Sequence, residues 1–493
     1  MPQTKEMIDL GFSLHQKGKL DEAESAYEEA LKLDNRNAEV YNLIGVLKLQ
    51  QGDIVSAIDS AEKAISISPE NYFFETLFQA YIRNKDYQKI ADSEALVMKL
   101  YPTSFSLLFN LALAFKNLKQ NNKAIMYYEK ALKENPASYQ GWFNLAHLYS
   151  VEAQTSNAVS ALKICKKLRP EDDEIEYFLG IALMRTKDYT KGLKYFEKRI
   201  SRTGAIAINN KTYPNKARLD NIWQGENIKD KTLLVYYEAG FGDVIMFSRF
   251  LPMAKKRCKK LIFICQKQLA PLFKDNKHLG IDEIIDTFVP ENSIEFDVHA
   301  PLMSLPYIMG LKNDNIFIST DEYLIPDKIK QEEYKNKYFN TDKIKIGIKW
   351  KGNTYYDSDR VIPAEKFIPL ISINDTQFYS FQTFEGAESV SELKDVIDIG
   401  KELIDFSQTA AALSNLELVI CNDTSLAHLA GALGIPCWIA LPYEVNWRWH
   451  TDLSVCDWYD NIRLFRQERP GDWDSVFRQI ESEIKTILSS FIG

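Results

Sequence analysis

The chain has 493 residues, a net charge of −8 and a mean hydropathy of −0.28, with 45% hydrophobic and 26% charged residues. A chain of this length and ordinary globular composition is predicted to form about three domains. Its acidic balance disfavours nucleic acid as a partner, and no uninterrupted apolar stretch of about 18 residues predicts a membrane span. We therefore expect neither a nucleic-acid partner nor a transmembrane segment.

The first residues, MPQTKEMIDLGFSLHQ, lack the charged segment and apolar run of a signal peptide. The cysteines form no C-x-x-C pair, a spacing typical of zinc and redox sites. They are Cys165, Cys258, Cys265, Cys421, Cys437 and Cys456. We expect reduced core thiols, no bound metal and a cytoplasmic location.

The first 200 residues repeat themselves with a period of about 34 residues. Small or apolar residues recur at Gly11, Gly45, Phe78, Ala112, Ala146 and Gly180, and again at Ala23, Ala57, Ile90, Ala124, Ala158 and Gly192. Prolines close four of the units, at Pro69, Pro102, Pro136 and Pro170. Small residues suit the close contact of two antiparallel helices, and proline ends the second helix, so the pattern is that of tetratricopeptide repeats.

Six repeats are predicted, forming an α-solenoid over residues 1–205. The third, at about 71–104, carries Phe78 and Ile90 at its small-residue positions, which predicts a local distortion. The sixth lacks a closing proline and is expected to run directly into the second half of the chain. Such repeats usually hold a partner on their concave face and carry no chemistry of their own.

The expected groove is lined by the first helix of each repeat, with Asn42, Asn110, Trp142, Asn144 and Tyr177 as candidates. The three asparagines share one repeat position and can hydrogen-bond an extended peptide backbone without demanding one sequence. A polypeptide acceptor is therefore preferred over a saccharide. The alternative is that the repeats mediate self-association or docking to an assembly.

After a polar connector at 206–230, short apolar runs alternate with helical stretches, which is typical of a parallel sheet. The runs are TLLVYY, LIFIC, IEFDV, KIGIKW, FYSFQ, LELVIC and CWIAL. The charged segment at about 326–343 divides this half into two Rossmann-like lobes, at 231–335 and 336–493. Two such lobes facing a cleft form a GT-B fold, so the predicted fold class is an α-solenoid followed by an α/β GT-B unit. Ligands in these folds bind beyond the carboxyl ends of the strands.

The first site candidate is the turn that holds Gly240, Gly242 and Asp243, between the strand TLLVYY and the helix that follows it. Glycines let the backbone approach a ligand, and a helix N-terminus offers free N–H groups to phosphate. Asp243 is expected either to project into the cleft as a catalytic group or to cap the helix.

A second candidate follows the strand KIGIKW, where Lys349 and Lys351 precede Arg360. Arginine donates two parallel hydrogen bonds to phosphate, and lysine acts as a point charge. Ordinary exposed surface charge is the alternative interpretation of these residues.

The third candidate is the strand-to-helix junction that contains Asp423, Thr424, Ser425 and His428. The first three can cap the helix while hydroxyl and amide groups face a diphosphate, and His428 lies one turn further along. A packed core histidine is the alternative for His428.

Aromatic and polar groups near the strand ends of the second lobe are candidates for contact with the base or the sugar. They are Gln382, after FYSF, and Trp447, Arg448 and Trp449, after CWIALP. An aromatic or guanidinium plane can stack on a base. The tryptophans could instead close the interface between the lobes.

From about residue 223 to 480 the chain resembles heptosyltransferase-like glycosyltransferases that bacteria fuse to tetratricopeptide repeats. It resembles the lipopolysaccharide heptosyltransferases of glycosyltransferase family 9 more distantly, and its arrangement is similar to that of protein O-GlcNAc transferases. The matching stretches are YEAGFGDVIMFSRFLP, HAPLMSLP, IGIKWKGN, DRVIPAEKF, CNDTSLAHLAGALGIP, WRWHTD and WYDNIRLFRQERPGDW.

The resemblance implies that Asp243 is the catalytic base and that Arg360 contacts the donor phosphate, in a place where the family has lysine. It also implies that Asp423, Thr424 and His428 bind the nucleotide diphosphate. Two residues depart from the family pattern: Ser425 replaces a glycine and Ile362 a tryptophan.

The expected function is transfer of a sugar from a nucleotide-diphosphate sugar to an acceptor recruited by the repeats, with inversion and without a metal ion or another cofactor. A helix dipole and cations would stabilise the departing diphosphate. The alternative from another class is a non-catalytic adaptor that binds nucleotide sugar.

Overall fold

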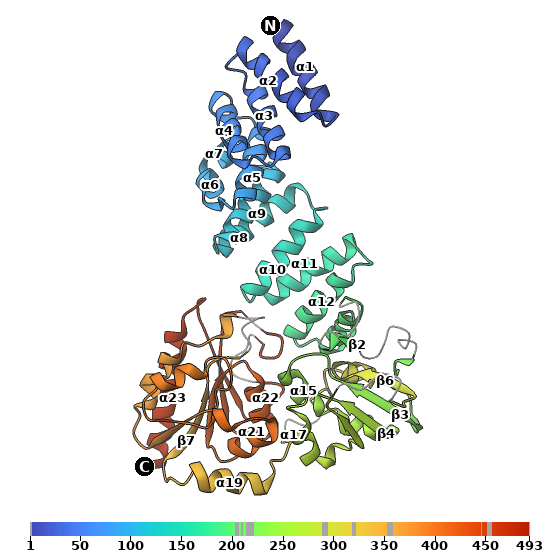
Figure 1. The fold of residues 1–493 in the computed structure, drawn as a ribbon, viewed down its shortest axis with the longest axis vertical. Coiled ribbons are helices and arrows are strands. Elements are labelled where there is room, and N and C mark those ends of the chain that lie inside the picture. Colours follow the sequence, from blue (N-terminus) through green and yellow to red (C-terminus); the bar gives the residue numbers. More distant parts are fainter. Residues whose placement is uncertain are drawn as a thin grey trace. The chain divides into compact units, whose positions relative to one another are not determined.

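A computed structural model describes residues 2–202, 207–208, 211–212, 221–287, 294–317, 322–352, 358–444, 446–450 and 456–492. Two compact units divide the chain, Met1–Pro170 and Glu171–Gly493. The first is entirely helical where it is described, and the second contains two parallel sheets (Figure 1). Of the expected connector at 206–230, residues 206, 209–210 and 213–220 lie outside the described part.

The first unit is a solenoid of antiparallel helix pairs, as the repeat predicts. Its helices are α1 (Pro2–Gln16), α2 (Leu20–Leu33), α3 (Ala38–Gln51), α4 (Ile54–Ile67), α5 (Asn71–Asn84), α6 (Tyr87–Asp92), α7 (Glu94–Leu100), α8 (Phe105–Asn117), α9 (Asn121–Glu134), α10 (Tyr139–Val151) and α11 (Thr155–Leu168). Several first helices are capped by a side chain, for example by Asn37, Ser104 and Ser138, each of which accepts a hydrogen bond from the first turn.

The degenerate third repeat has an interrupted second helix. Where the other repeats of this unit have one long helix, α6 and α7 are separated at Ser93, whose hydroxyl donates to the carbonyl of Ile90 at 2.6 Å. A serine that bonds back to the preceding turn bends a helix. The sequence predicts a distortion in this repeat, and in the structure the distortion is the helix break at Ser93.

The helices of the sixth repeat belong to the second unit, whereas the sequence places the domain boundary near residue 205. They are α12 (Asp173–Arg185), α13 (Tyr189–Phe196) and the short α14 (Arg199–Arg202). The reason is packing, since Tyr189, Leu193 and Phe196 are buried in the same hydrophobic core as side chains of both lobes. We call α12 to α14 the sixth hairpin.

The first lobe is built on a four-stranded parallel sheet of order β5-β4-β3-β6. Its elements are β3 (Ile228–Tyr236), α15 (Phe241–Ser248), α16 (Leu251–Lys255), β4 (Cys258–Ile264), α17 (Ala270–Asp275), β5 (Glu283–Ile285), β6 (Val298–Pro301) and α18 (Leu305–Ile308). The run IEFDV does not form the expected strand, because β6 begins only at its last residue.

The second lobe is built on a six-stranded parallel sheet of order β12-β11-β10-β7-β8-β9. Its elements are α19 (Lys328–Tyr338), β7 (Ile344–Lys349), α20 (Ile368–Ile371), β8 (Thr376–Ser380), β9 (Val396–Asp398), α21 (Phe406–Leu413), β10 (Leu418–Asn422), α22 (Ser425–Ala432), β11 (Cys437–Leu441), β12 (Ile462–Arg466) and α23 (Trp473–Ile492). The predicted lobe boundary at 335/336 falls inside α19, which packs against α21 and so goes with this lobe.

In both sheets the first strand is the point where the strand order reverses. In the first lobe, β4 and β5 lie on one side of β3 and β6 on the other; in the second lobe, β8 and β9 lie on one side of β7 and β10 on the other. Crevices open at such switch points, beyond the carboxyl ends of the two central strands. The chain therefore places ligand-binding loops after β3, β7 and β10.

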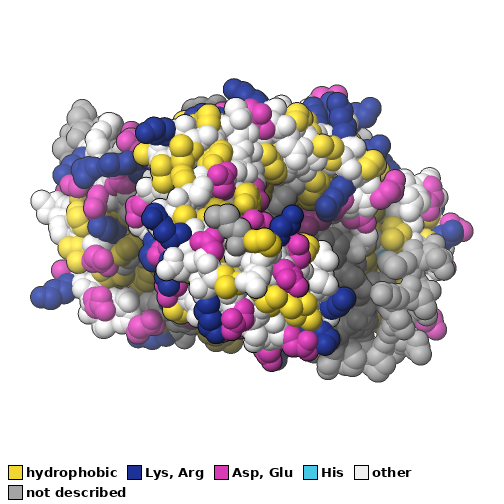
Figure 2. Space-filling model, turned by 90° about the horizontal axis from the view of Figure 1, so that it is seen from above, with side chains coloured by type: hydrophobic (Ala, Val, Ile, Leu, Met, Phe, Trp, Pro, Cys, Tyr) yellow, Lys and Arg dark blue, Asp and Glu magenta, His cyan; other side chains and the backbone are white. Residues whose placement is uncertain are grey.

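No helix in the described part of the chain is long and apolar enough to cross a membrane. On the face seen in Figure 2, basic and acidic side chains are interspersed, without the continuous basic stripe that binds nucleic acid.

Candidate functional site

The second unit contains a cavity of about 850 Å³ that is lined by both lobes. The loops after β3, β7 and β10 all reach it, as the switch points predict. A cavity of this size is within the range of small-molecule and cofactor sites.

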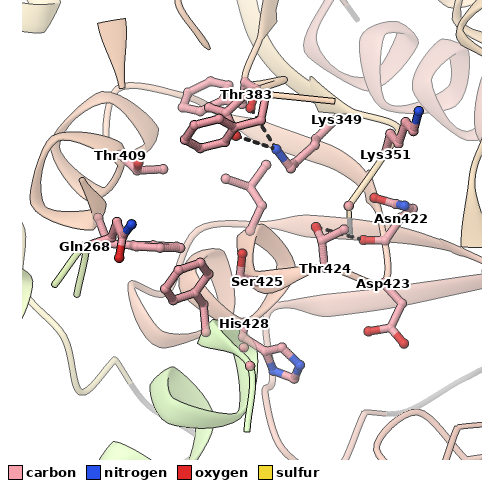
Figure 3. A pocket seen from close by; sticks show the side chains of 18 of the residues that line it. Gln268, Lys349, Lys351, Thr383, Thr409, Asn422, Asp423, Thr424, Ser425 and His428 are labelled. Atoms are coloured by element: carbon pink, nitrogen blue, oxygen red, sulfur yellow. Dashed lines mark hydrogen bonds between the residues drawn. The ribbon is translucent and has the colours of Figure 1, made fainter. Parts of the chain in front are cut away.

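The predicted phosphate-binding and catalytic residues come together in the wall of this cavity. They are Gly240, Gly242, Asp243, Lys351, Arg360, Asp423, Thr424, Ser425 and His428. These residues come from both lobes and are far apart in the sequence. Only the arrangement of the two lobes brings them into one site. Figure 3 shows side chains that line the cavity, with ten of them labelled.

Asp243 is not a helix cap. The N-cap of α15 is Gly240, and Asp243 lies three residues into the chain beyond it, in the first helical turn. Its Oδ1 forms an ion pair with Arg448 of the second lobe, and both side chains are largely buried. Of the two interpretations of Asp243, the structure therefore agrees with projection into the cleft.

Gly242 permits the two lobes to approach each other. A Cβ at this position would lie 2.7 Å from Cδ2 of His428. Helices α15 and α22 pack against each other here, with both N-terminal ends at the cavity. Free N–H groups and the positive ends of two helix dipoles thus face one space, which suits an anion.

The N-terminus of α22 is open toward the cavity. Thr424 is its N-cap, but the Thr424 side chain makes no capping bond and instead donates to the carbonyl of Asn422 at 3.4 Å. Helix geometry leaves the N–H groups of Ser425 and Leu426 without an intrahelical acceptor. Both residues line the cavity, where these donors can meet a phosphate oxygen.

Arg360 and Asp423 are partners of each other. The Arg360 guanidinium lies 3.1 Å from Oδ2 of Asp423, and the Asp423 side chain is buried while Arg360 remains one-third exposed. An ionised carboxylate repels phosphate, so Asp423 fits the site as the group that orients Arg360. This alters the role that sequence reasoning gives to Asp423.

His428 is a neutral, packed side chain that nevertheless reaches the cavity. It is 4% exposed, its Nδ1 lies 3.0 Å from the Tyr459 hydroxyl, and its ring stacks on Trp449. Burial lowers the pKa of His428 to about 4. At neutral pH it can therefore donate a hydrogen bond to a ligand but cannot offer it a positive charge.

Lys349 is a buried cation at the cavity wall, and the sequence does not distinguish it from Lys351. It ends β7, is 8% exposed, and its ammonium donates to the carbonyl of Phe381 at 3.2 Å and to the hydroxyl of Thr383 at 3.3 Å (Figure 3). It forms no ion pair with any described carboxylate, and burial lowers its pKa to about 8. A buried ammonium without a counter-ion at a cavity wall is arranged to receive an anion.

Lys351 is less favourably placed. Its ammonium lies 4.0 Å from the Glu385 carboxylate, and in Figure 3 it points away from Ser425. Two residues apart, Lys349 and Lys351 would share a face of a continuing strand, but β7 ends at Lys349, so this alternation does not extend to Lys351.

The three expected base contacts do not line the cavity. Gln382 is 1% exposed and uses its amide to brace backbone groups of Lys351 and Glu385. Trp447 and Trp449 are 5% and 0% exposed. These side chains complete the packing of the unit, which is the alternative left open for the tryptophans, and Arg448 pairs with Asp243.

The cavity rim instead carries exposed apolar groups. Phe384 is 85% exposed and Ile404 is 72% exposed, and both line the cavity. Phe384 also has a φ of 55°, a left-handed conformation that is uncommon for a bulky residue. No periodicity marks a lone loop phenylalanine, so the sequence gives no signal for it.

The groove candidates are divided between the two units. Asn42, Asn110, Trp142 and Asn144 lie in the first unit and Tyr177 in the second. Asn42 and Asn144 are buried, and Asn144 donates to the Tyr128 hydroxyl at 3.0 Å. The Trp142 indole donates to the carbonyl of Pro136, and the Tyr177 ring stacks on Phe196. Asn110 is half-buried, and a peptide-binding role for this set stays a prediction.

In the described residues, no group of three or more His, Cys, Asp or Glu side chains could hold a metal ion.

Comparison with known proteins bears on the two units separately. Family models described as TPR repeat and tetratricopeptide repeat match residues 11–52, and 38–71 and 105–138. The N-terminal region therefore consists of tetratricopeptide repeats. A structure titled as YrrB, a TPR protein with an unusual peptide-binding site, is 18% identical, covering 34% of this chain and 88% of its own, with a TM-score of 0.31.

Protein FlbA of Caulobacter vibrioides is 21% identical over 532 residues, which cover 94% of this chain and 87% of FlbA. The protein O-mannosyl-transferase TMTC3 of Homo sapiens is 26% identical over 39% of this chain and 22% of its own length. A solved glycosyl transferase family 9 protein from Veillonella parvula is 15% identical, covering 53% of this chain and 91% of its own, with a TM-score of 0.39. The chain is a tetratricopeptide solenoid followed by an α/β unit of GT-B architecture.

Proposed function

We propose that this protein is a glycosyltransferase that moves a sugar from a nucleotide-diphosphate sugar to an acceptor recruited by the repeats, and that the acceptor is a polypeptide. One observation carries the proposal: a cavity between the lobes holds on one wall an open helix N-terminus and Lys349, which has no carboxylate partner among the described residues, and holds Asp243 on the other wall. The first wall suits a diphosphate and the second suits a base.

In the proposed reaction the acceptor oxygen attacks the anomeric carbon as the bond from that carbon to the diphosphate breaks. Oδ2 of Asp243 takes the acceptor's proton, because Oδ1 is held by Arg448 and Oδ2 makes no hydrogen bond within the described chain. Attack from the face opposite the leaving group inverts the anomeric centre. The N–H groups of α22, Lys349 and Arg360 stabilise the charge that develops on the diphosphate.

The nucleobase is proposed to stack on Phe384 at the cavity rim. Contact with water does not stabilise an exposed aromatic ring, whereas the stacking of a base on such a ring is favourable by about 1–3 kcal/mol. The cations that would meet the diphosphate, Lys349 and Arg360, line the same cavity.

The first experiment is a thermal-shift screen of nucleoside diphosphates, followed by slow hydrolysis of the matching nucleotide sugars by the purified protein. Asp243→Asn is expected to lower turnover by about 10²–10⁴-fold while nucleotide affinity is retained. Full turnover in Asp243→Asn would show that the base is another group.

A nucleotide-binding adaptor without transfer activity is the second candidate. The observation that favours it is the ion pair itself, because Arg448 already occupies one oxygen of Asp243. Measurable binding of a nucleoside diphosphate together with no hydrolysis of any sugar in the panel would decide for the adaptor.

A further inference from the structure

The sixth hairpin reaches the candidate site through a buried arginine. Arg199, the first residue of α14, is 8% exposed. Its guanidinium donates to both carboxylate oxygens of Glu238, at 2.5 and 3.1 Å, and to the hydroxyl of Ser304 at 2.7 Å. Glu238 and Ser304 belong to the first lobe, so one side chain fixes two of its loops. A bidentate pair of this kind sets direction as well as distance.

Glu238 stands immediately before the turn that carries the candidate base. Only Ala239 separates it from Gly240, the N-cap of α15, and Asp243 lies in the first turn of that helix. The turn contains Gly240 and Gly242, whose backbone freedom makes its conformation depend on what holds its ends. On the strand side it is held by the pair between Glu238 and Arg199, together with the Gln266 amide, which donates to the carbonyl of Ala239 at 3.0 Å.

The same hairpin also contacts the loop of the second lobe that carries Arg448. Phe196 of α13 packs against Trp447 with ring centroids 6.1 Å apart, and Arg448 stacks over the Trp447 ring at 4.3 Å. Two residues further on, Nε2 of His450 lies 2.5 Å from the hydroxyl of Tyr189. Tyr189 and Phe196 lie at the two ends of α13.

We propose that the sixth hairpin positions both partners of the Asp243–Arg448 pair, with Arg199 and Tyr189 as positioning residues, and that it is therefore part of the catalytic unit and not of the acceptor-binding solenoid. This inference rests on the proposed function for its catalytic consequence. The two partners come from different lobes, and the sixth hairpin contacts the segment that carries each of them, in addition to the direct packing of α15 on α22. A displacement of about 1 Å at a reacting group costs on the order of 10²-fold in rate.

The test uses the full chain and the double variant Arg199→Met/Glu238→Gln. Removing Arg199 alone leaves the buried Glu238 carboxylate without its partner, whereas the double variant removes that charge and leaves only Glu197, the second partner of Arg199 and 19% exposed, without the guanidinium. Hydrogen exchange is expected to become faster in peptides covering 239–250 and 446–450 and to stay unchanged in the helices of the first unit. Turnover of the nucleotide sugar found in the panel is expected to fall about 10- to 100-fold, with its KM changed far less.

Two matched variants complete the design. Lys198→Ala removes the neighbouring cation, whose partners Asp173 and Glu176 both lie in α12, and is expected to leave exchange and turnover at the wild-type values. Tyr189→Phe removes only the hydroxyl that meets His450, and is expected to speed exchange at 446–450 but not at 239–250.

The outcomes separate this inference from the proposed function. Wild-type exchange at 239–250 in the double variant overturns the inference, whatever the activity. An equal fall of turnover in Lys198→Ala overturns it as well, because any disturbance of the hairpin would then suffice. If the wild-type protein hydrolyses no nucleotide sugar, the proposed function fails, and the exchange measurements still decide whether the hairpin holds the pair.

Discussion

Lys349 shows how a single residue can be costly for stability and useful for binding. The unfolded chain keeps the lysine proton up to about pH 10.5, whereas burial lowers the pKa of Lys349 to about 8 in the folded unit. Between these values the unfolded state binds more protons, so the free energy of unfolding rises with pH across this window. Below pH 8 both states are protonated, and the cost of the buried charge is fully present.

Lys349→Met is expected to stabilise the second unit at pH 7 by up to about 3 kcal/mol, because a lowering of one pKa unit is equivalent to about 1.4 kcal/mol. The gain should shrink as the pH approaches 10. Nucleoside diphosphate affinity should fall in the same variant. Denaturant unfolding at pH 7 and 10, with calorimetric titration, measures both effects.

Lys351→Met is the matched control, since the Lys351 side chain is one-quarter exposed and pairs with Glu385. Little change in stability is expected from it. A Lys349→Met protein less stable than wild type at pH 7, with undiminished nucleotide affinity, would contradict the anion-binding role of Lys349.

Phe384 gives a second test at this scale. Phe384→Ala is expected to weaken nucleotide binding by about 1–3 kcal/mol with little change in stability, because the ring is 85% exposed and alanine keeps the Cβ that the left-handed backbone must accommodate. Phe384→Trp should retain the affinity, since it keeps a ring on which a base can stack.

By contrast, Trp447→Ala is expected to cost about 3–5 kcal/mol in stability, because the Trp447 side chain fills the core between Phe196, Phe247 and Trp458.

Calorimetry measures the nucleotide affinity of the Phe384 variants. Equal affinities of Phe384→Ala and the wild type would mean that the base binds in another part of the cavity.

At the scale of elements, the sixth hairpin decides where the chain can be divided. A chain that begins at residue 171 keeps α12 to α14, which bury Tyr189, Leu193 and Phe196 against both lobes. A chain that begins at residue 205 loses them and exposes that apolar surface.

We expect the chain from 171 to give one cooperative thermal transition and to bind nucleotide, and the chain from 205 to aggregate or to melt at a lower temperature. Differential scanning calorimetry and light scattering compare the two. Equal melting temperatures would mean that the hairpin contributes nothing to the second unit.

At the scale of the whole molecule, the two units are expected to divide recognition from chemistry. If the repeats recruit the acceptor, the chain from 171 should hydrolyse the nucleotide sugar at the full-length rate but transfer the sugar to the native acceptor far less efficiently, because remote binding energy raises transfer efficiency. Transfer assays with both chains, at equal hydrolysis rates, make the comparison. Undiminished transfer by the shorter chain would rule out recruitment by the solenoid.

The sequence by itself determined the features that depend on local periodicity. A repeat of about 34 residues predicts the helix pairs of the first unit, and Phe78 and Ile90 mark the repeat whose second helix is broken at Ser93. Long apolar runs predict β3, β4, β7, β8, β10 and β11. The strands β5 and β9 have three residues each, which is too short for a pattern to emerge.

Only the tertiary structure decided which of the marked residues share a site and what each of them does there. Asp243 and Arg448 meet because two lobes close on each other, and no spacing in the sequence encodes that distance. Burial separates Lys349 from Lys351 and turns Trp447 from a base contact into core. The sixth hairpin has the sequence of a repeat, yet it packs with the lobes, because the surface that buries its apolar side chains is formed by residues far along the chain.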